Sequence, residues 1–240
     1  MRRLLLATAI LAAVAVAAVL FVAAQPREER VVDELGEVHE VIKAAGFAIV
    51  KHGPSRYQYS NESYIKYLRG RAESWDRWKK LVDKYGDEVY QAYVVPCRLL
   101  TPEEFLEMAK GLPGRVVKIN SYAFVNGTWY DSGSAKVNEN LTEAVERARK
   151  DREFIYSVLN ITGDVEVYIA AFVLEAPLRE LYALSKKGDL AMVDVPLDII
   201  WRLREQGYRV VVERVAYGEV PLTKRLDLCQ WVKDAGRKPE

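Results

Sequence analysis

The stretch EVYQAYVV at residues 88–95 decides the fold, because residues 166–173 read EVYIAAFV and nearly repeat it. Both stretches are rich in β-branched and aromatic residues, which favour strands. Each is followed by a segment with the pattern of a short helix and then by a second β-rich run. Segments 88–125 and 166–195 therefore predict two strand–helix–strand units about 78 residues apart, related by duplication or by convergence.

The helices inside the two units begin at recognisable signals. Residues 101–104 (TPEE) combine a capping threonine, a proline at the first helical position and a glutamate that completes a capping box. Pro177 opens the second helix, which carries Leu181 and Leu184 and stops at Gly188. Two paired units of this kind predict an α+β fold with ferredoxin-like connections, in which one sheet has helices mainly on one face.

On the N-terminal side of these units, apolar residues spaced by four, three and four positions mark one helical face: Val31, Leu35, Val38 and Ile42. This spacing predicts a helix over residues 28–44. Charged helices are expected over residues 62–85 and 140–159. Because no linker rich in proline or serine interrupts residues 27–233, we expect one domain there and a polar tail at residues 234–240.

Residues 4–24 (LLLATAILAAVAVAAVLFVAA) contain no charged residue. An apolar run of about 20 residues is long enough to cross a bilayer as a helix, whereas the apolar region of a signal peptide is usually shorter. The small residues before Gln25 nevertheless fit a cleavage site after Ala24. We therefore predict that residues 1–26 form a transmembrane anchor, with a cleaved signal peptide as the alternative.

The orientation of this segment follows from the charges on its two sides. Arg2 and Arg3 precede the apolar run, whereas the charges that follow it are balanced. Positively charged flanks remain on the cytoplasmic side of a membrane. We expect a single-pass membrane protein with residues 27–233 outside the cell, or a secreted protein if cleavage occurs after Ala24. The membrane, contacted through residues 4–24, is the first expected partner.

The composition excludes several classes of protein. Lys and Arg number 35 against 34 Asp and Glu, and half of the residues are hydrophobic. Disordered chains have fewer apolar residues, and proteins that bind nucleic acid through bulk charge carry a basic excess. Residues 1–24 contribute two arginines and no acidic residue, so the rest of the chain has a net charge of about −1. We expect no nucleic-acid partner.

Four Asn-x-Ser/Thr sequons agree with an exterior location and make the chain a candidate glycoprotein. They begin at Asn61, Asn126, Asn140 and Asn160. Asparagines of this kind also have structural roles. Asn126 followed by Gly127 is a strong hairpin signal, and Asn140 with Glu143 has the spacing of a helix cap.

The two cysteines, Cys97 and Cys229, have no spacing typical of a zinc site. A disulfide between them is permitted outside the cytoplasm, and it would tie the C-terminal segment to the middle of the domain. The alternative is a pair of buried thiols. We expect the disulfide.

A group of aromatic residues forms a candidate surface for a protein or glycan partner: Tyr57, Tyr59, Tyr64, Tyr67, Trp75 and Trp78. Several of these rings would have to be exposed together to form such a surface. The alternative is packing in the core, because rings at helical spacing are usually buried. The exposure of these side chains distinguishes the two hypotheses.

The sequence contains no arrangement typical of a catalytic or metal site. Its only histidines, His39 and His52, are expected to be solvated or capping residues. The motifs of zinc proteases, serine hydrolases, nucleotide-binding loops and dinucleotide-binding folds are absent. We therefore expect no catalytic, cofactor-binding or metal-ligating residues.

These observations favour a non-enzymatic, membrane-anchored extracytoplasmic module that binds a protein or a glycan. Two alternatives remain open. One is an extracytoplasmic hydrolase that uses carboxylates or His52, which requires a pocket with converging acids. The other is a structural subunit of a surface filament or envelope, which requires an exposed sheet edge.

Overall fold

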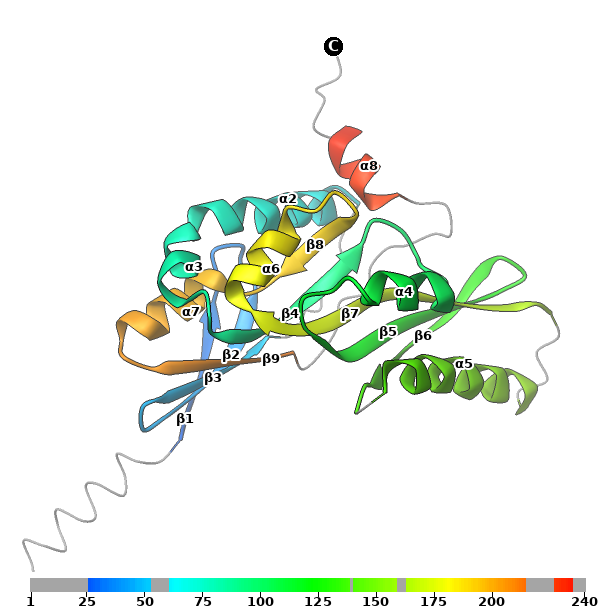
Figure 1. Ribbon diagram of the computed structural model, residues 1–240, viewed down its shortest axis with the longest axis horizontal. Helices are drawn as coiled ribbons and strands as arrows, with labels where there is room; N and C mark the ends of the chain where they lie inside the picture. Colours follow the sequence, from blue (N-terminus) through cyan, green and yellow to red (C-terminus); the bar gives the residue numbers. More distant parts are fainter. Residues whose placement is uncertain (1–25, 53–60, 139, 159–162, 215–226, 235–240) are drawn as a thin grey trace, which may run out of the picture.

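The computed structural model describes residues 26–52, 61–138, 140–158, 163–214 and 227–234. Within these residues the chain forms an α+β fold with two sheets and seven helices (Figure 1). The sequence predicted an α+β fold, but with one sheet. The second sheet contains residues that the sequence pattern assigned to a helix.

The larger sheet has five strands in the order β6-β5-β7-β4-β8, and all neighbouring strands are antiparallel. Its strands and connecting helices are β4 (Val89–Pro96), α4 (Pro102–Ala109), β5 (Arg115–Val125), β6 (Thr128–Lys136), β7 (Val165–Pro177), α6 (Leu178–Ser185) and β8 (Leu190–Asp194). Figure 1 shows α4 and α6 in front of the strands that they connect. Each of the two segments that resemble each other therefore contains a strand, a helix and a strand.

The two segments interlock within the sheet. Helix α4 leads from β4 to β5 across β7, and α6 leads from β7 to β8 across β4. Strands β4 and β7, which carry the repeated stretch, are direct neighbours. Val94 pairs with Phe172, and both are the seventh residue of their stretch. The register therefore places one pair of equivalent residues, Val94 and Phe172, opposite each other.

A hairpin and a long helix separate the two segments along the chain. Asn126 and Gly127 have positive φ angles of 49° and 79°, as the central residues of a tight hairpin turn between β5 and β6 require. Helix α5 (Leu141–Val158) begins after Asn140, whose Oδ1 accepts a hydrogen bond from Thr142 N at 2.9 Å. Both asparagines thus have the turn and cap roles that their sequence context predicted.

The smaller sheet has four strands in the order β1-β2-β3-β9. They are β1 (Arg27–Val32), β2 (Val38–Ala44), β3 (Phe47–His52) and β9 (Arg209–Arg214). Strands β1, β2 and β3 are antiparallel, whereas β9 is parallel to β3. Because β9 follows α7 (Leu197–Glu205), all of the larger sheet lies between β3 and β9 in the sequence.

The helix predicted over residues 28–44 is wrong, because these residues form β1, β2 and the turn between them. Asp33 fixes the turn: its Oδ1 accepts hydrogen bonds from Leu35 N at 2.8 Å and from Glu37 N at 2.9 Å. Gly36 has a φ of +86°, which a helix does not allow. The apolar residues that matched a helical spacing belong instead to two paired strands, where β-branched valines are favoured.

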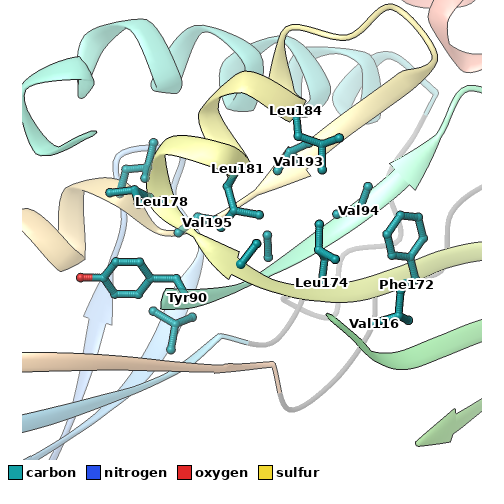
Figure 2. Packing of buried hydrophobic residues seen from close by; sticks show 14 of the residues in the cluster. Tyr90, Val94, Val116, Phe172, Leu174, Leu178, Leu181, Leu184, Val193 and Val195 are labelled. Atoms are coloured by element: carbon teal, nitrogen blue, oxygen red, sulfur yellow. The ribbon is translucent and has the colours of Figure 1, made fainter. Parts of the chain in front are cut away.

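The core lies on both faces of the larger sheet, because successive side chains of a strand point to opposite faces. On β4, Tyr90 and Val94 face one side and Tyr93 faces the other. Figure 2 shows leucines of α6 packed against side chains of β4, β7 and β8. The same cluster contains Val41 and Val212 of the smaller sheet, so one hydrophobic core joins the two sheets.

Two helices, α2 (Asn61–Arg77) and α3 (Lys79–Tyr85), replace the single helix predicted over residues 62–85. The last helix, α8 (Leu228–Asp234), is short. None of the described helices is long and apolar enough to cross a membrane. The predicted anchor at residues 4–24 lies outside the described residues.

Candidate functional site

Charged side chains are buried where the smaller sheet meets the larger one. We define this buried charge cluster by six residues: Asp33, Glu37, His39, Tyr67, Arg71 and Asp194. The first two lie in the turn between β1 and β2, the third lies in β2, the next two lie one helical turn apart in α2, and the last ends β8. Three separate parts of the chain therefore contribute to one cluster: residues 33–39, helix α2 and the end of β8.

Arg71 is the centre of the buried charge cluster, and its side chain is 1% exposed. Its Nη2 lies 2.5 Å from Asp33 Oδ2 and 2.7 Å from Glu37 Oε2. Its Nε lies 2.9 Å from Asp194 Oδ1. The Tyr67 hydroxyl donates to Asp194 Oδ2 at 3.0 Å. One cation therefore joins the carboxylates of the hairpin turn to a carboxylate of the larger sheet.

His39 is fully buried, so the prediction that it is solvated or caps a helix is wrong. Its Nε2 lies 3.0 Å from Asp33 Oδ2. The helix predicted for residues 28–44 would have placed His39 differently. In strand β2 its side chain points to the inner face of the sheet, beside buried Val41.

The electrostatics of the cluster keep its central pair ionised. Burial alone would raise the pKa of Asp33, but the hydrogen bond with His39 and the charge of Arg71 hold it well below its ordinary value. Burial alone would lower the pKa of Arg71, but the surrounding carboxylates, Asp194 foremost, raise it well above its ordinary value. Asp33 and Arg71 therefore form a buried ion pair.

Asp33, Glu37 and His39 are residue types that bind metal ions, and their ligand atoms lie within 4.8 Å of one another. Arg71 Nη2, however, is within hydrogen-bonding distance of both carboxylates and occupies the place of a shared cation. A metal ion there would have to displace the guanidinium. The arrangement has the geometry of a structural ion-pair network.

Helix α7 holds the same hairpin from another side. Glu34 N donates a hydrogen bond to Asp198 Oδ2 at 3.1 Å, and Arg202 Nη2 donates to Val32 O at 3.0 Å. Burial and the nearby charge of Asp33 raise the pKa of Asp198. The hairpin is thus fastened both to α2 and to α7.

The side of the smaller sheet that faces away from the core carries several exposed apolar side chains. We call its side chains the outer face: Glu28, Arg30 and Val32 of β1, Val38, Glu40, Ile42 and Ala44 of β2, Phe47, Ile49 and Lys51 of β3, and Arg209, Val211 and Glu213 of β9. Val38, Phe47 and Val211 are 45%, 49% and 43% exposed. Their neighbours along the strands, such as Ala48 and Val210, are buried.

The strand register arranges the outer face in rows. One row is mostly apolar and contains Glu28, Ile42, Ile49 and Val211. The adjacent row alternates in charge and contains Arg30, Glu40, Lys51 and Glu213. On the other side of the apolar row, Phe47 is paired with Arg209, whose guanidinium lies 5.9 Å from the centre of the ring. An exposed apolar patch with a charged rim is typical of interaction sites.

Cys97 and Cys229 form a disulfide, as the sequence predicted. It attaches α8 to the segment that follows β4. Leu228 beside it is fully buried, and its backbone N donates to Cys97 O at 2.7 Å. Disulfides are typical of proteins in oxidising compartments. Asp227 lies close to both sulfur atoms, but cysteines joined in a disulfide are not thiolate ligands for a metal ion.

The aromatic residues of the candidate partner surface have interior positions where the structure describes them. Tyr64 and Trp75 are 3% and 1% exposed, and Trp75 Nε1 donates to Val193 O at 2.8 Å. Tyr67 belongs to the buried charge cluster, and Trp78 is half-buried. Tyr64 and Trp75 are thus packed in the core, whereas Tyr67 and Trp78 are partly buried against it, and a partner surface formed by the whole group stays a prediction.

The other residues singled out in the sequence analysis lie in different parts of the chain. Tyr57, Tyr59 and Asn160 lie outside the described residues. Asn61 is the first residue of α2, and His52 is the last residue of β3.

A cavity of about 290 Å³ lies beside the start of α5. It is lined by Lys136, Asn138, Asn140, Glu143, Ala144 and Arg147. Among the described residues of this lining Glu143 is the one acid, so these residues do not supply the pair of carboxylates that the hydrolase hypothesis requires.

The chain matches no protein-family model, no curated protein and no solved structure. Its function is therefore inferred from geometry. Two features stand out, the buried charge cluster and the outer face, and the sequence pattern indicated neither. A local signal for the turn was present, since Asp33 followed by Gly36 is typical of a turn. The partners of Asp33 in α2 and β8 have no local signal.

Proposed function

We propose that the chain is a non-enzymatic extracytoplasmic interaction module that is anchored through residues 4–24 and binds a partner with its outer face. The exposure of Val38, Phe47 and Val211 on one side of one sheet carries this proposal. Antiparallel sheets with one face in water usually have polar side chains on that face. Exposed apolar residues on such a face indicate a surface that a partner covers.

The buried charge cluster supports a structural role better than a hydrolase. A general acid or base must come within hydrogen-bonding distance of its substrate. The side chains of Asp33, His39 and Asp194 have no exposed area, and Asp33 and Asp194 are engaged by Arg71. Chemistry at this cluster would require the hairpin to leave the larger sheet.

The edge of the smaller sheet argues against a filament subunit that assembles by strand addition. Strand β1 pairs with β2 on one side and forms the edge of the sheet. It begins with Arg27, Glu28, Glu29 and Arg30, all of which are exposed. Charged side chains on an edge strand oppose pairing with a further strand. The face of this sheet is therefore the better candidate surface.

An exterior location is part of the same proposal. Arg2 and Arg3 before the apolar run, the four sequons and the disulfide all support it. The balanced charge favours a protein or glycan partner over nucleic acid. If cleavage occurs after Ala24, the same domain is secreted.

We further infer that the larger sheet is a ferredoxin-like scaffold built from the segments 88–125 and 166–195. The strand order β8-β4-β7-β5 and the direct pairing of Val94 with Phe172 support this inference. Strand β6 and helix α5 are additions between the two segments. The scaffold uses both of its sheet faces for packing, whereas the outer face of the smaller sheet has exposed apolar side chains, which supports its role as the binding surface.

Site-specific photo-crosslinking tests the proposed function. A photo-reactive phenylalanine analogue replaces Val211 in the full chain, within the cells that naturally make it. Irradiation should give a covalent product heavier than the chain, because a partner covers this position. The mass of the product is measured by immunoblot and mass spectrometry.

The matched control places the same analogue at Lys187, which is exposed in the turn between α6 and β8 of the larger sheet and does not belong to the outer face. This position should give little or no heavier product. Absence of any product from position 211, with the protein present at its normal level, would refute the proposed function.

A further inference from the structure

The charge pattern of the outer face is complementary to itself. Across the four strands, in the order β1, β2, β3 and β9, the charged row reads Arg30, Glu40, Lys51 and Glu213. Its signs are plus, minus, plus and minus. Reversing the order of the strands converts each sign into its opposite. A surface with this property can pair with a second copy of itself without meeting a like charge.

We propose that the partner of the outer face is a second copy of this chain, packed face to face about a twofold axis parallel to the strands. This inference rests on the proposed function. Such an axis reverses the order of the strands but keeps the position of each row along the strands, so each row faces the same row of the second copy. It places Glu40 opposite Lys51 of the second copy and Arg30 opposite Glu213 of the second copy. All four contacts of the row are then between opposite charges.

The same axis brings the two inner residues of the apolar row together at the centre of the interface, whereas Glu28 at one end of the row faces Val211 of the second copy at the rim. Ile42 faces Ile49 of the second copy, and Phe47 faces Ala44 of the second copy. Packed sheets keep their strand directions within about 30° of each other, so a nearly aligned pair of sheets is an ordinary arrangement. The two central strands lie nearest the axis, and their contacts are the least affected by sheet twist.

Two further considerations select this axis. The alternative is a twofold axis that runs between the two sheets and perpendicular to their strands. It keeps the strand order, so if it passed over the charged row it would place Arg30 opposite Arg30 of the second copy. It would also direct the two β1 strands in opposite directions. The proposed axis places both copies of Arg27 at the same end of the dimer. Both strands β1 then begin at the same end of the dimer, as suits two chains anchored in one membrane.

The size of the face predicts a weak dimer. Four strands at a spacing of about 4.8 Å and six residues at about 3.3 Å each span roughly 20 by 20 Å, or about 400 Å² of sheet. Stable interfaces bury about 800 Å² per partner. Attachment to one membrane raises the effective concentration of the two copies and favours association. Charge complementarity therefore decides whether the dimer forms.

Charge reversal tests the proposed dimer on the mature full chain in mild detergent, by sedimentation equilibrium. Glu40→Lys alone, or Lys51→Glu alone, creates two like-charge contacts in each dimer. Each variant should raise the dimer Kd about tenfold or more. An equimolar mixture of the two variants should restore the wild-type Kd, because positions 40 and 51 of one variant then meet opposite charges on the other. The double variant E40K/K51E should also dimerise.

The mixture guards against loss of folding, because a variant that fails to fold is not rescued by another. Lys187→Glu makes the same charge change outside the outer face and should leave the Kd unchanged. A chain that remains monomeric at about millimolar concentration overturns the dimer, and so does a set of variants with the wild-type Kd. A crosslink from position 211 to a different protein, or to a segment of the same chain, would also refute the proposed dimer. A crosslink to a different protein would leave the proposed function standing, whereas no crosslink would refute both.

Discussion

Arg71 balances three carboxylates that would otherwise be buried without a counterion. Its guanidinium contacts Asp33 and Glu37 in the turn between β1 and β2 and Asp194 at the end of β8. Burying a charge is unfavourable unless it is paired and hydrogen-bonded. The loss of stability on removing Arg71 therefore depends mainly on the buried carboxylates that would be left without a counterion.

Replacement of Arg71 by alanine should lower the free energy of unfolding by about 3–5 kcal/mol, because it leaves buried carboxylates unpaired. Urea unfolding of the wild type and the variant at neutral pH measures this change. Arg71→Lys keeps the charge but loses the planar fork, so its effect should be intermediate.

Arg77 in the same helix provides the control for this prediction. It pairs with Glu34 and Glu73 at the surface, and its side chain is 45% exposed. Exposed ion pairs contribute about 1 kcal/mol or less, so Arg77→Ala should change stability little. Equal effects of the two alanine substitutions would show that the cluster does not hold the sheets together.

Some elements are specified by residues close together in the sequence, whereas others depend on contacts with distant parts of the chain. Helix α4 begins with a complete capping box, in which Glu104 N donates to Thr101 Oγ1 at 3.2 Å and Thr101 N donates to Glu104 Oε2 at 2.9 Å. All of these groups lie within four residues, so the sequence predicted this start correctly. Helix α8, with seven residues, is too short to be stable alone and depends on its attachments.

Loss of the disulfide should release α8. In the chain-entropy treatment, a crosslink over 132 residues contributes about 5 kcal/mol to the stability of the fold. The variant C97S/C229S should therefore be less stable by up to this amount. Its amides in Leu228–Asp234 should exchange with solvent much faster than those of β4. Hydrogen exchange followed by mass spectrometry measures both segments, and unchanged protection of α8 would contradict the prediction.

At the scale of the whole molecule, one long-range pairing joins the two ends of the domain. Strand β9 pairs in parallel with β3, although the entire larger sheet lies between them in the sequence. The buried charge cluster and the shared core then hold the hairpin β1–β2 against α2 and β8. The outer face is complete only after this pairing, because β9 is one of the four strands that form it.

This topology predicts an order of folding. Closing a long loop costs more entropy than closing a short one, so pairings that are distant in sequence form late. Amides of β5 and β6, which form a hairpin, should be protected before those of β9. Pulsed hydrogen exchange during refolding measures the order. Simultaneous protection of β6 and β9 would contradict it.

Local patterns of the sequence determined the strands and helices of the larger sheet. The repeated stretch EVY, the capping box and the Asn-Gly turn specify their conformations through neighbours within a few residues. The same approach failed for residues 28–44, because apolar residues at that spacing fit one helical face and also two strands of a hairpin. In the structure the hairpin has both local support, from the hydrogen bonds of Asp33 in the turn, and long-range support, from the contact of Asp33 with Arg71, which is 38 residues away.

The sequence by itself determined the α+β class, the two strand–helix–strand segments and the candidate disulfide pair. Only the tertiary structure decided that His39 and Asp33 are buried with Arg71, and that the charges of β1, β2, β3 and β9 lie in one alternating row. The physical reason is that secondary structure depends mainly on near neighbours along the chain. A buried ion pair and a sheet face depend on partners that the fold brings together from distant positions.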